Sequence, residues 1–271
     1  MSALASCVDP LEWPAPVEVL NAGSLSPVVL ICDHASNHIP ASYELLGLPA
    51  SHFERHIAYD IGAAAVTRSL AGLLNAPAFL GTYSRLLVDL NRPFGSSTSM
   101  PTLSESTEIP GNRALGERET TLRRKAVFEP FHAAVSDFLD SRTTPSLILA
   151  IHSFTPVFLG VLRPWHVGIL HEGMPDVAHA FISALTHEPG LVVGENVPYR
   201  IERDSDFAVP VHGTDRGNPA ALIEIRNDLI ADDAGAAAWA DRLAAIVPEV
   251  TAVLLPASGW TTKKGNPDVR Q

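Results

Sequence analysis

Two histidines and one glutamate are placed at short apolar runs that lie far apart in the sequence. His34 follows the run Val28–Cys32, His152 follows the run Leu147–Ile151, and Glu224 lies within an apolar run of its own. Each run has the composition of a β-strand that is buried on both faces. In open α/β sheets, ligands bind at the edge where the carboxyl ends of the strands meet. Two imidazoles and a carboxylate at that edge are the usual ligands of a catalytic zinc ion, and a second carboxylate is then free to act as general base.

A hydrogen-bonded histidine at the end of a strand is the alternative for His34 and for His152 taken singly. Ser153 follows His152 directly, but neighbouring residues of a strand point to opposite faces, so no Ser–His dyad is expected. The other histidines considered are expected to be surface or packing residues: His56, His132, His179 and His187.

A second unusual segment places Arg85, Asp89, Asn91 and Arg92 in or beside an apolar stretch, Leu86–Leu90, that is predicted to be a strand. Arginine is rarely buried without a partner. The guanidinium of Arg92 can donate two parallel hydrogen bonds to the carboxylate of a ligand. The alternative is an internal ion pair of either arginine with Asp89, and both can hold if Asp89 orients one arginine while the other faces substrate.

The elements that must position these residues alternate between strand and helix. The pattern predicts strands at 27–32, 78–80, 86–90, 146–151, 166–170, 191–193 and 220–225, and helices at 60–74, 117–141, 176–187 and 234–247. This order predicts a single α/β domain over residues 1–271, with a mixed, mainly parallel central sheet flanked by helices. Its core is expected at about 28–255, with irregular ends at 1–26 and 261–271. The Ser- and Pro-rich stretch 93–113 is expected to be a functional lid or disordered.

Composition narrows the class of protein. The chain has 271 residues, of which 46% are hydrophobic, enough for one large core. Its 19 Lys and Arg against 30 Asp and Glu leave a net charge of −11, which argues against binding of nucleic acid or anionic membranes. The two cysteines form no disulfide framework, so a cytoplasmic location is expected. Neither a signal peptide nor an apolar run of about 18 residues is found.

Several motifs in order resemble those of the N-formylglutamate amidohydrolase family, whose fold is similar to that of the zinc carboxypeptidases (a phosphorylase/hydrolase-like fold). The resemblance covers about Val28 to Leu229. It rests on the segments Cys32–Pro40, Asp60–Ala63, Ser84–Arg85, Asp89–Pro93, Ile151–Ser153, Gly194–Tyr199, His212–Gly213 and Glu224–Leu229.

The resemblance implies a role for each of the matching residues. His34 and His152 resemble the histidine ligands of one zinc ion. Asn91 and Arg92 resemble the Asn–Arg pair of the carboxypeptidases that grips a substrate carboxylate. Glu224 resembles the glutamate that activates the hydrolytic water.

The third metal ligand departs from the carboxypeptidase pattern. Those enzymes have a glutamate three residues after the first histidine, and here that position is Asn37, whose amide is a poor zinc ligand. Asp60 is the expected replacement, and its alternative is a plain helix N-cap. Asp33 and His38 are weaker candidates.

These expectations define a zinc-dependent amidohydrolase that acts on a small acidic substrate, in the first place N-formyl-L-glutamate, giving formate and glutamate. Arg85 is expected to hold a second carboxylate or the developing oxyanion. Tyr199 and His212 are expected near the site, as donors to the substrate or to the leaving group, although both could be plain loop residues. The alternatives are a zinc hydrolase acting on another N-acyl amino acid or peptide-like amide, or a non-catalytic binder of a metal or acidic metabolite.

Overall fold

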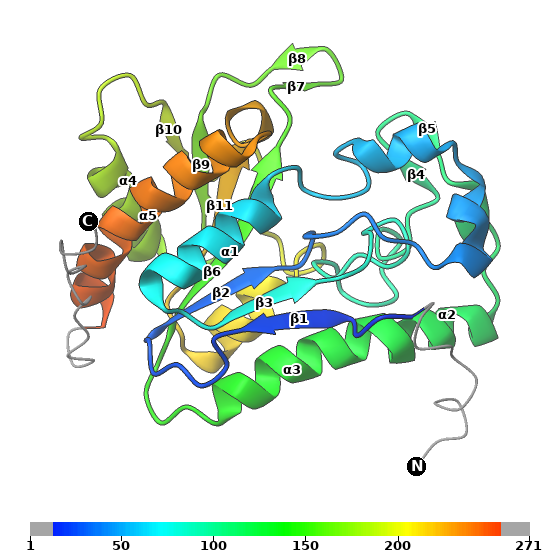
Figure 1. The fold of residues 1–271 in the computed structure, drawn as a ribbon, viewed down its shortest axis with the longest axis horizontal. Helices are drawn as coiled ribbons and strands as arrows, with labels where there is room; N and C mark the ends of the chain where they lie inside the picture. The colour runs from blue at the N-terminus through cyan, green and yellow to red at the C-terminus, as the bar shows by residue number, and fades with distance from the viewer. Residues whose placement is uncertain (1–12, 256–271) are drawn as a thin grey trace, which may run out of the picture.

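Short runs of aliphatic residues form a seven-stranded sheet in the computed structural model, which describes residues 13–255 (Figure 1). Four central strands are parallel, while β1 at one edge and the β9–β10 pair at the other run in the opposite direction. In spatial order the strands are β1 (Val17–Leu20), β3 (Ala78–Gly81), β2 (Val28–Cys32), β6 (Leu147–Phe154), β11 (Ala220–Arg226), β9 (Val167–Leu170) and β10 (Val193–Glu195). The predicted fold class, a single α/β domain with a mixed, mainly parallel sheet, is confirmed.

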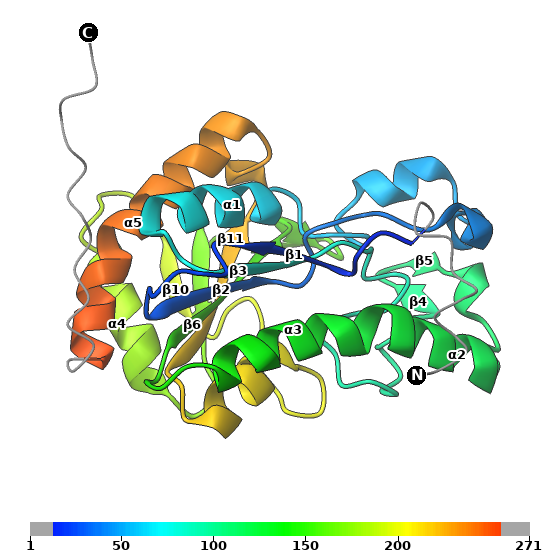
Figure 2. The same cartoon turned by 60° about the horizontal axis from the view of Figure 1, so that its bottom comes forward.

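Helices cover both faces of the sheet (Figure 2). One face packs against α1 (Ala63–Leu74), α4 (Pro175–Leu185) and α5 (Asp233–Leu254). The other packs against α3 (Glu129–Asp140) and the π-type turn Arg124–Phe128, which joins α3 to α2 (Glu117–Arg123). Alternate residues of each central strand enter the two cores, so the strands are apolar throughout. None of the helices described combines the length and hydropathy that crossing a membrane requires.

The prediction of a strand at 86–90 is wrong. This segment is a buried loop of turns that follows β3. The side chain of Asn112 donates to the carbonyl of Leu86 at 2.8 Å, and Arg123 donates to the carbonyl of Leu87 at 2.9 Å. These side chains satisfy the backbone groups that a neighbouring strand would otherwise pair with, so the apolar run is buried without being a strand.

The expectation of an irregular segment over 1–26 is also wrong in part, because Val17–Leu20 form the edge strand β1. The prolines at positions 14 and 16 obscure this short strand in the sequence. Residues 261–271, expected to be irregular, lie outside the described residues, and the outer boundaries of the domain stay a prediction.

Helix α1 does not use Asp60 as its N-cap. The N-cap is Gly62, with a φ of +80°, and no side chain caps the helix. A Cβ at position 62 would lie 2.1 Å from the carbonyl oxygen of Ile230, so only glycine fits this close approach. The turn therefore leaves the carboxylate of Asp60 available for contacts at the edge of the sheet.

The stretch 93–113 contains a two-stranded hairpin, β4 (Leu103–Ser104) and β5 (Thr107–Glu108). Its tip is held by an ion pair between Arg55 and Glu105, with an N–O distance of 2.8 Å. This hairpin gives the stretch a regular structure, and its movement as a lid stays a prediction.

Candidate functional site

The carboxyl ends of three parallel strands bring the predicted site residues together. Asp33 and His34 follow β2, while His152 in β6 and Glu224 in β11 are register partners on the same face of the sheet. Ser153 points to the opposite face and donates its hydroxyl to the carbonyl of residue 61. These strands form the floor of a pocket with a volume of about 460 Å³.

A buried group of one aspartate and two histidines could hold a metal ion. One ligand atom from each of Asp33, His34 and His152 lies within 4.8 Å of the other two. Both carboxylate oxygens of Asp33, Nδ1 of His34 and Nε2 of His152 are buried, and Nε2 of His152 lies 3.0 Å from Asp33 Oδ1. Nδ1 of His34 lies 3.8 Å from the same oxygen and 3.5 Å from Asp60 Oδ2, and neither ring nitrogen forms a well-aligned hydrogen bond. Two ring nitrogens and a carboxylate that converge in this way could hold a metal ion. The two rings are nearly perpendicular, with centroids 4.9 Å apart.

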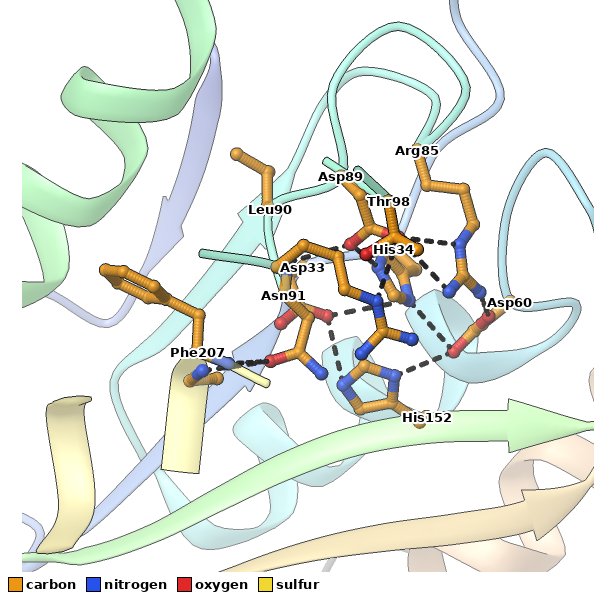
Figure 3. Close-up of polar contacts among 12 residues, drawn as sticks. Asp33, His34, Asp60, Arg85, Asp89, Leu90, Asn91, Thr98, His152 and Phe207 are labelled. Carbon is orange, nitrogen blue, oxygen red and sulfur yellow. Dashed lines mark hydrogen bonds and ion pairs between the residues drawn. The ribbon is translucent and has the colours of Figure 1, made fainter. Parts of the chain in front are cut away.

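The other nitrogen of each histidine contacts a second aspartate (Figure 3). His34 Nε2 lies 2.7 Å from Asp89 Oδ1, and His152 Nδ1 lies 2.9 Å from Asp60 Oδ2. Burial alone would raise the pKa of both carboxyls, but the neighbouring positive charges, above all that of His34, hold the pKa of each well below its usual range. Metal-binding histidines are commonly oriented in this way by a carboxylate.

Asp60 and Asp89 are bridged by Arg85. The guanidinium donates through Nη1 to Asp60 Oδ1 at 3.1 Å and through Nε to Asp89 Oδ2 at 3.3 Å. Arg85 also lines the pocket, so it combines an internal ion pair with access to a bound molecule.

The Asn91–Arg92 pair lies on the pocket wall, but a carboxylate of the protein already contacts it. Arg92 Nη1 lies 3.0 Å from Asp206 Oδ1, and Asn91 Nδ2 lies 3.4 Å from the same oxygen. The other end of the Asn91 amide accepts hydrogen bonds from the backbone of residues 207 and 208 at 3.2 and 2.9 Å. A substrate carboxylate that binds Nη1 of Arg92 and Nδ2 of Asn91 would take the place of Asp206.

Glu224 is a carboxylate held in an apolar strand beside the two histidines. Its side chain is 6% exposed, and Oε2 has no hydrogen-bond partner. Burial raises the pKa of Glu224 to about 7, while the charge of His152 acts in the opposite direction. A carboxyl with such a pKa is suited to accept and return a proton near neutral pH.

Tyr199 and His212 have different positions. Tyr199 lines the pocket, where its hydroxyl accepts a hydrogen bond from Arg163. His212 is fully buried and lies outside the pocket lining, because the turn Ala208–Gly213 directs its ring toward α3. The expectation that His212 donates to substrate is therefore not supported by its position.

His212 instead forms a pair with His132 of α3. Nε2 of His132 donates to the carbonyl of Leu90 at 2.9 Å, so its Nδ1 accepts from His212 Nε2 at 3.0 Å. Burial lowers the pKa of His132 to about 4 and that of His212 to about 3. Both rings are thus neutral parts of the core at neutral pH.

The sequence-based prediction ranks Asp60 above Asp33 as the metal ligand and assigns no role to His56 or Asp206. Asp33 directly follows a buried strand, which is the signal that could have raised its rank. His56 lines the pocket, and burial lowers its pKa to about 4. Asn37 donates to a backbone carbonyl, that of Phe53 at 2.7 Å, which agrees with its exclusion as a ligand.

Comparisons with known proteins identify relatives of this chain. The family model of N-formylglutamate amidohydrolase matches residues 26–231. Among solved structures, the gene product Atu2144 from Agrobacterium tumefaciens is 37% identical, with a TM-score of 0.84, over 88% of this chain and 95% of that one. The structure of N-formylglutamate amidohydrolase from Ralstonia eutropha is 18% identical, with a TM-score of 0.63, over 89% of this chain and 98% of that one. No curated protein matched this chain.

The matched family consists of hydrolases that act on amide bonds. This chain belongs to the N-formylglutamate amidohydrolase family, because the family model covers most of its length. The resemblance inferred from the sequence motifs is thereby confirmed.

The buried pair His132–His212 predicts a loss of stability in mild acid. Histidines of the unfolded chain titrate near pH 6.5, whereas the folded pair resists protonation, so protons favour unfolding below that pH. The free energy of unfolding is expected to be unaffected by this pair above pH 6.5, and to fall by about 2 kcal/mol per histidine at pH 5. Urea unfolding at pH 7.5 and 5.0 measures the difference.

The double variant His132→Gln/His212→Gln should show a smaller difference between the two pH values than the wild-type chain. His187→Gln, which replaces an exposed histidine, should leave the difference unchanged. An equal pH dependence in the double variant and the wild type would contradict the assignment.

Proposed function

We propose that this chain is a metal-dependent amidohydrolase that cleaves the amide bond of an N-acyl amino acid, with N-formyl-L-glutamate as the favoured substrate. The observation that carries the proposal is the buried cluster of ligand atoms of Asp33, His34 and His152, all within 4.8 Å of one another, beside the buried carboxyl of Glu224. Family membership supports the class of reaction. The name of the Ralstonia eutropha protein supports N-formylglutamate as the first substrate to test.

We assign Asp33, His34 and His152 as the ligands of one zinc ion. Two imidazole nitrogens and a carboxylate oxygen, with further positions open, suit catalytic zinc. Asp60 then orients His152 from the other side of the ring, instead of binding the metal as the sequence suggests. When bound, a divalent metal supplies a Lewis acid for a carbonyl oxygen and makes water more acidic.

Other side chains would transfer the proton and bind the substrate. Glu224 accepts a proton from the attacking water and passes it to the nitrogen of the leaving amino acid. Arg85 and the hydroxyl of Tyr199 face the pocket and can donate to oxygens of the substrate. Arg92 and Asn91 receive a substrate carboxylate in place of Asp206. The hairpin β4–β5 borders the same space and is placed to close over a bound molecule.

The proposed partner is a small acidic molecule, and the proposed location is the cytoplasm. The cytoplasmic location rests on the low cysteine content of the sequence. Cys32 is buried and free of a disulfide among the described residues, which is compatible with that proposal.

The ligand assignment predicts different effects for two similar substitutions. Asp33→Asn replaces a metal ligand, so the purified protein should lose its bound zinc. Asp60→Asn removes a charge that orients His152 and pairs with Arg85, but no ligand in this assignment. Zinc affinity should therefore fall by about 10- to 100-fold while stoichiometric binding is still reached at excess zinc. Inductively coupled plasma mass spectrometry and zinc titration measure both effects, and circular dichroism verifies that the variants are folded. Loss of zinc from the Asp60 variant alone would reverse the assignment.

The assignment of the general base predicts that Glu224→Gln uncouples zinc binding from turnover. Glutamine has the same shape but cannot accept the proton, so deformylation of N-formyl-L-glutamate should slow by about 10²- to 10⁴-fold with zinc retained. Glu249→Gln, which replaces an exposed glutamate of α5 outside the pocket, is the control and should keep the activity.

Full activity in the Glu224 variant would exclude this mechanism. A wild-type protein with neither zinc nor amidohydrolase activity would instead favour the non-catalytic binder.

A further inference from the structure

Arg163 is a buried cation to which the residues from 13 to 255 supply no acidic partner. Arg163 comes directly after the hairpin formed by β7 (Val157–Phe158) and β8 (Val161–Leu162), and it is 8% exposed. None of the ion pairs among the described residues includes Arg163, and its Nη1 has no hydrogen-bond partner. A buried charge without a counter-ion is costly, so an arginine is not expected here for stability alone.

Aromatic rings surround this guanidinium. Its Cζ lies 4.5 Å from the ring centroid of Phe158, 4.8 Å from that of Tyr199 and 5.9 Å from that of Phe154. Nη2 donates to the hydroxyl oxygen of Tyr199 at 2.9 Å. Ring faces attract a cation, but they do not neutralise its charge. Because Phe158 and Tyr199 both line the pocket, the charge of Arg163 lies directly behind the pocket wall.

The other buried or half-buried arginines of the pocket differ in this respect. Arg85 is neutralised by Asp60 and Asp89, and Arg92 is paired with Asp206. Arg163 therefore brings a positive charge without an ion-pair partner among the described residues to the wall that carries Tyr199, where the carboxyl of Glu224 supplies an opposing charge. The hydrogen bond from Nη2 also occupies the Tyr199 oxygen as an acceptor, so the phenolic proton is free to be donated into the pocket.

We propose that Arg163, acting through Tyr199, selects substrates with a side-chain carboxylate. The carboxylate accepts a hydrogen bond from the hydroxyl of Tyr199, which is 39% exposed, and is attracted by the buried guanidinium behind it. This inference rests on the proposed amidohydrolase function and assigns the residues that recognise the side-chain carboxylate of its substrate. Arg163 is a positioning and specificity residue, since it acts on the substrate through Tyr199.

The test compares N-formyl-L-glutamate with N-formyl-L-glutamine, which has nearly the same shape and no side-chain charge. The ratio of kcat/KM for the two substrates is measured in the wild type and in Arg163→Met. We expect the ratio to fall by about 10- to 100-fold in the variant, the factor that corresponds to one charge-assisted hydrogen bond. Tyr199→Phe, which removes the connecting hydroxyl, should lower the same ratio.

A melting temperature distinguishes selection from a structural role. Methionine fills a similar volume and carries no unpaired charge, so Arg163→Met should melt at the wild-type temperature or above it. Arg242→Met is the control for the substrate ratio: Arg242 also stacks on a ring, that of Trp239, but it pairs with Glu188 and lies on α5 away from the pocket. It should leave the substrate ratio unchanged.

Three outcomes would overturn the inference. An unchanged ratio in Arg163→Met, with an active wild type, would overturn the specificity role alone. A lower melting temperature with an equal loss on both substrates would show that Arg163 is structural. A wild type that hydrolyses neither substrate would overturn the proposed function, and the inference with it.

Discussion

Three aspartates and two histidines are buried side by side where the parallel strands end, and the compensation of their charges constrains the whole site. Carboxylates are stable in such a place only when cations or hydrogen-bond donors face them. Arg85 and the outer ring nitrogens of the histidines satisfy Asp60 and Asp89. Asp33 is left facing the two inner ring nitrogens, which is the place where a divalent cation would balance the group.

The sheet explains why this arrangement can be held firmly. His152 and Glu224 project from adjacent central strands at the same level, so their spacing is fixed by the strand pairing. The close approach of Gly62 to Ile230 positions the turn that carries Asp60. The pocket walls are formed by loops and hairpins, where residues such as Asp206 and Tyr199 can be substituted without disturbing the sheet. In the proposed function, the groups that act on the amide bond are held by the strands, and those that select the substrate are held by the loops.

The residues on strand ends could be predicted from the sequence, because a buried strand has a clear pattern and its carboxyl end has a known place. His34, His152 and Glu224 are brought together as expected. The preference for Asp60 over Asp33 depends on which side of the imidazole rings each carboxylate approaches, and spacing along the chain does not encode this. The strand predicted at 86–90 fails because Asn112 and Arg123, more than twenty residues away, satisfy its carbonyls. Likewise, nothing near Arg163 in the sequence indicates that its guanidinium is enclosed by rings without an acidic partner.

The most direct measurement of the central claim is anomalous X-ray diffraction at the zinc absorption edge, from crystals of the protein purified without chelator. One anomalous peak is expected, bound by Asp33, Nδ1 of His34 and Nε2 of His152, with Asp60 and Asp89 on the outer nitrogens of the rings. A peak coordinated by Asp60 in place of Asp33, or no peak between the two histidines in crystals supplied with zinc, would contradict it.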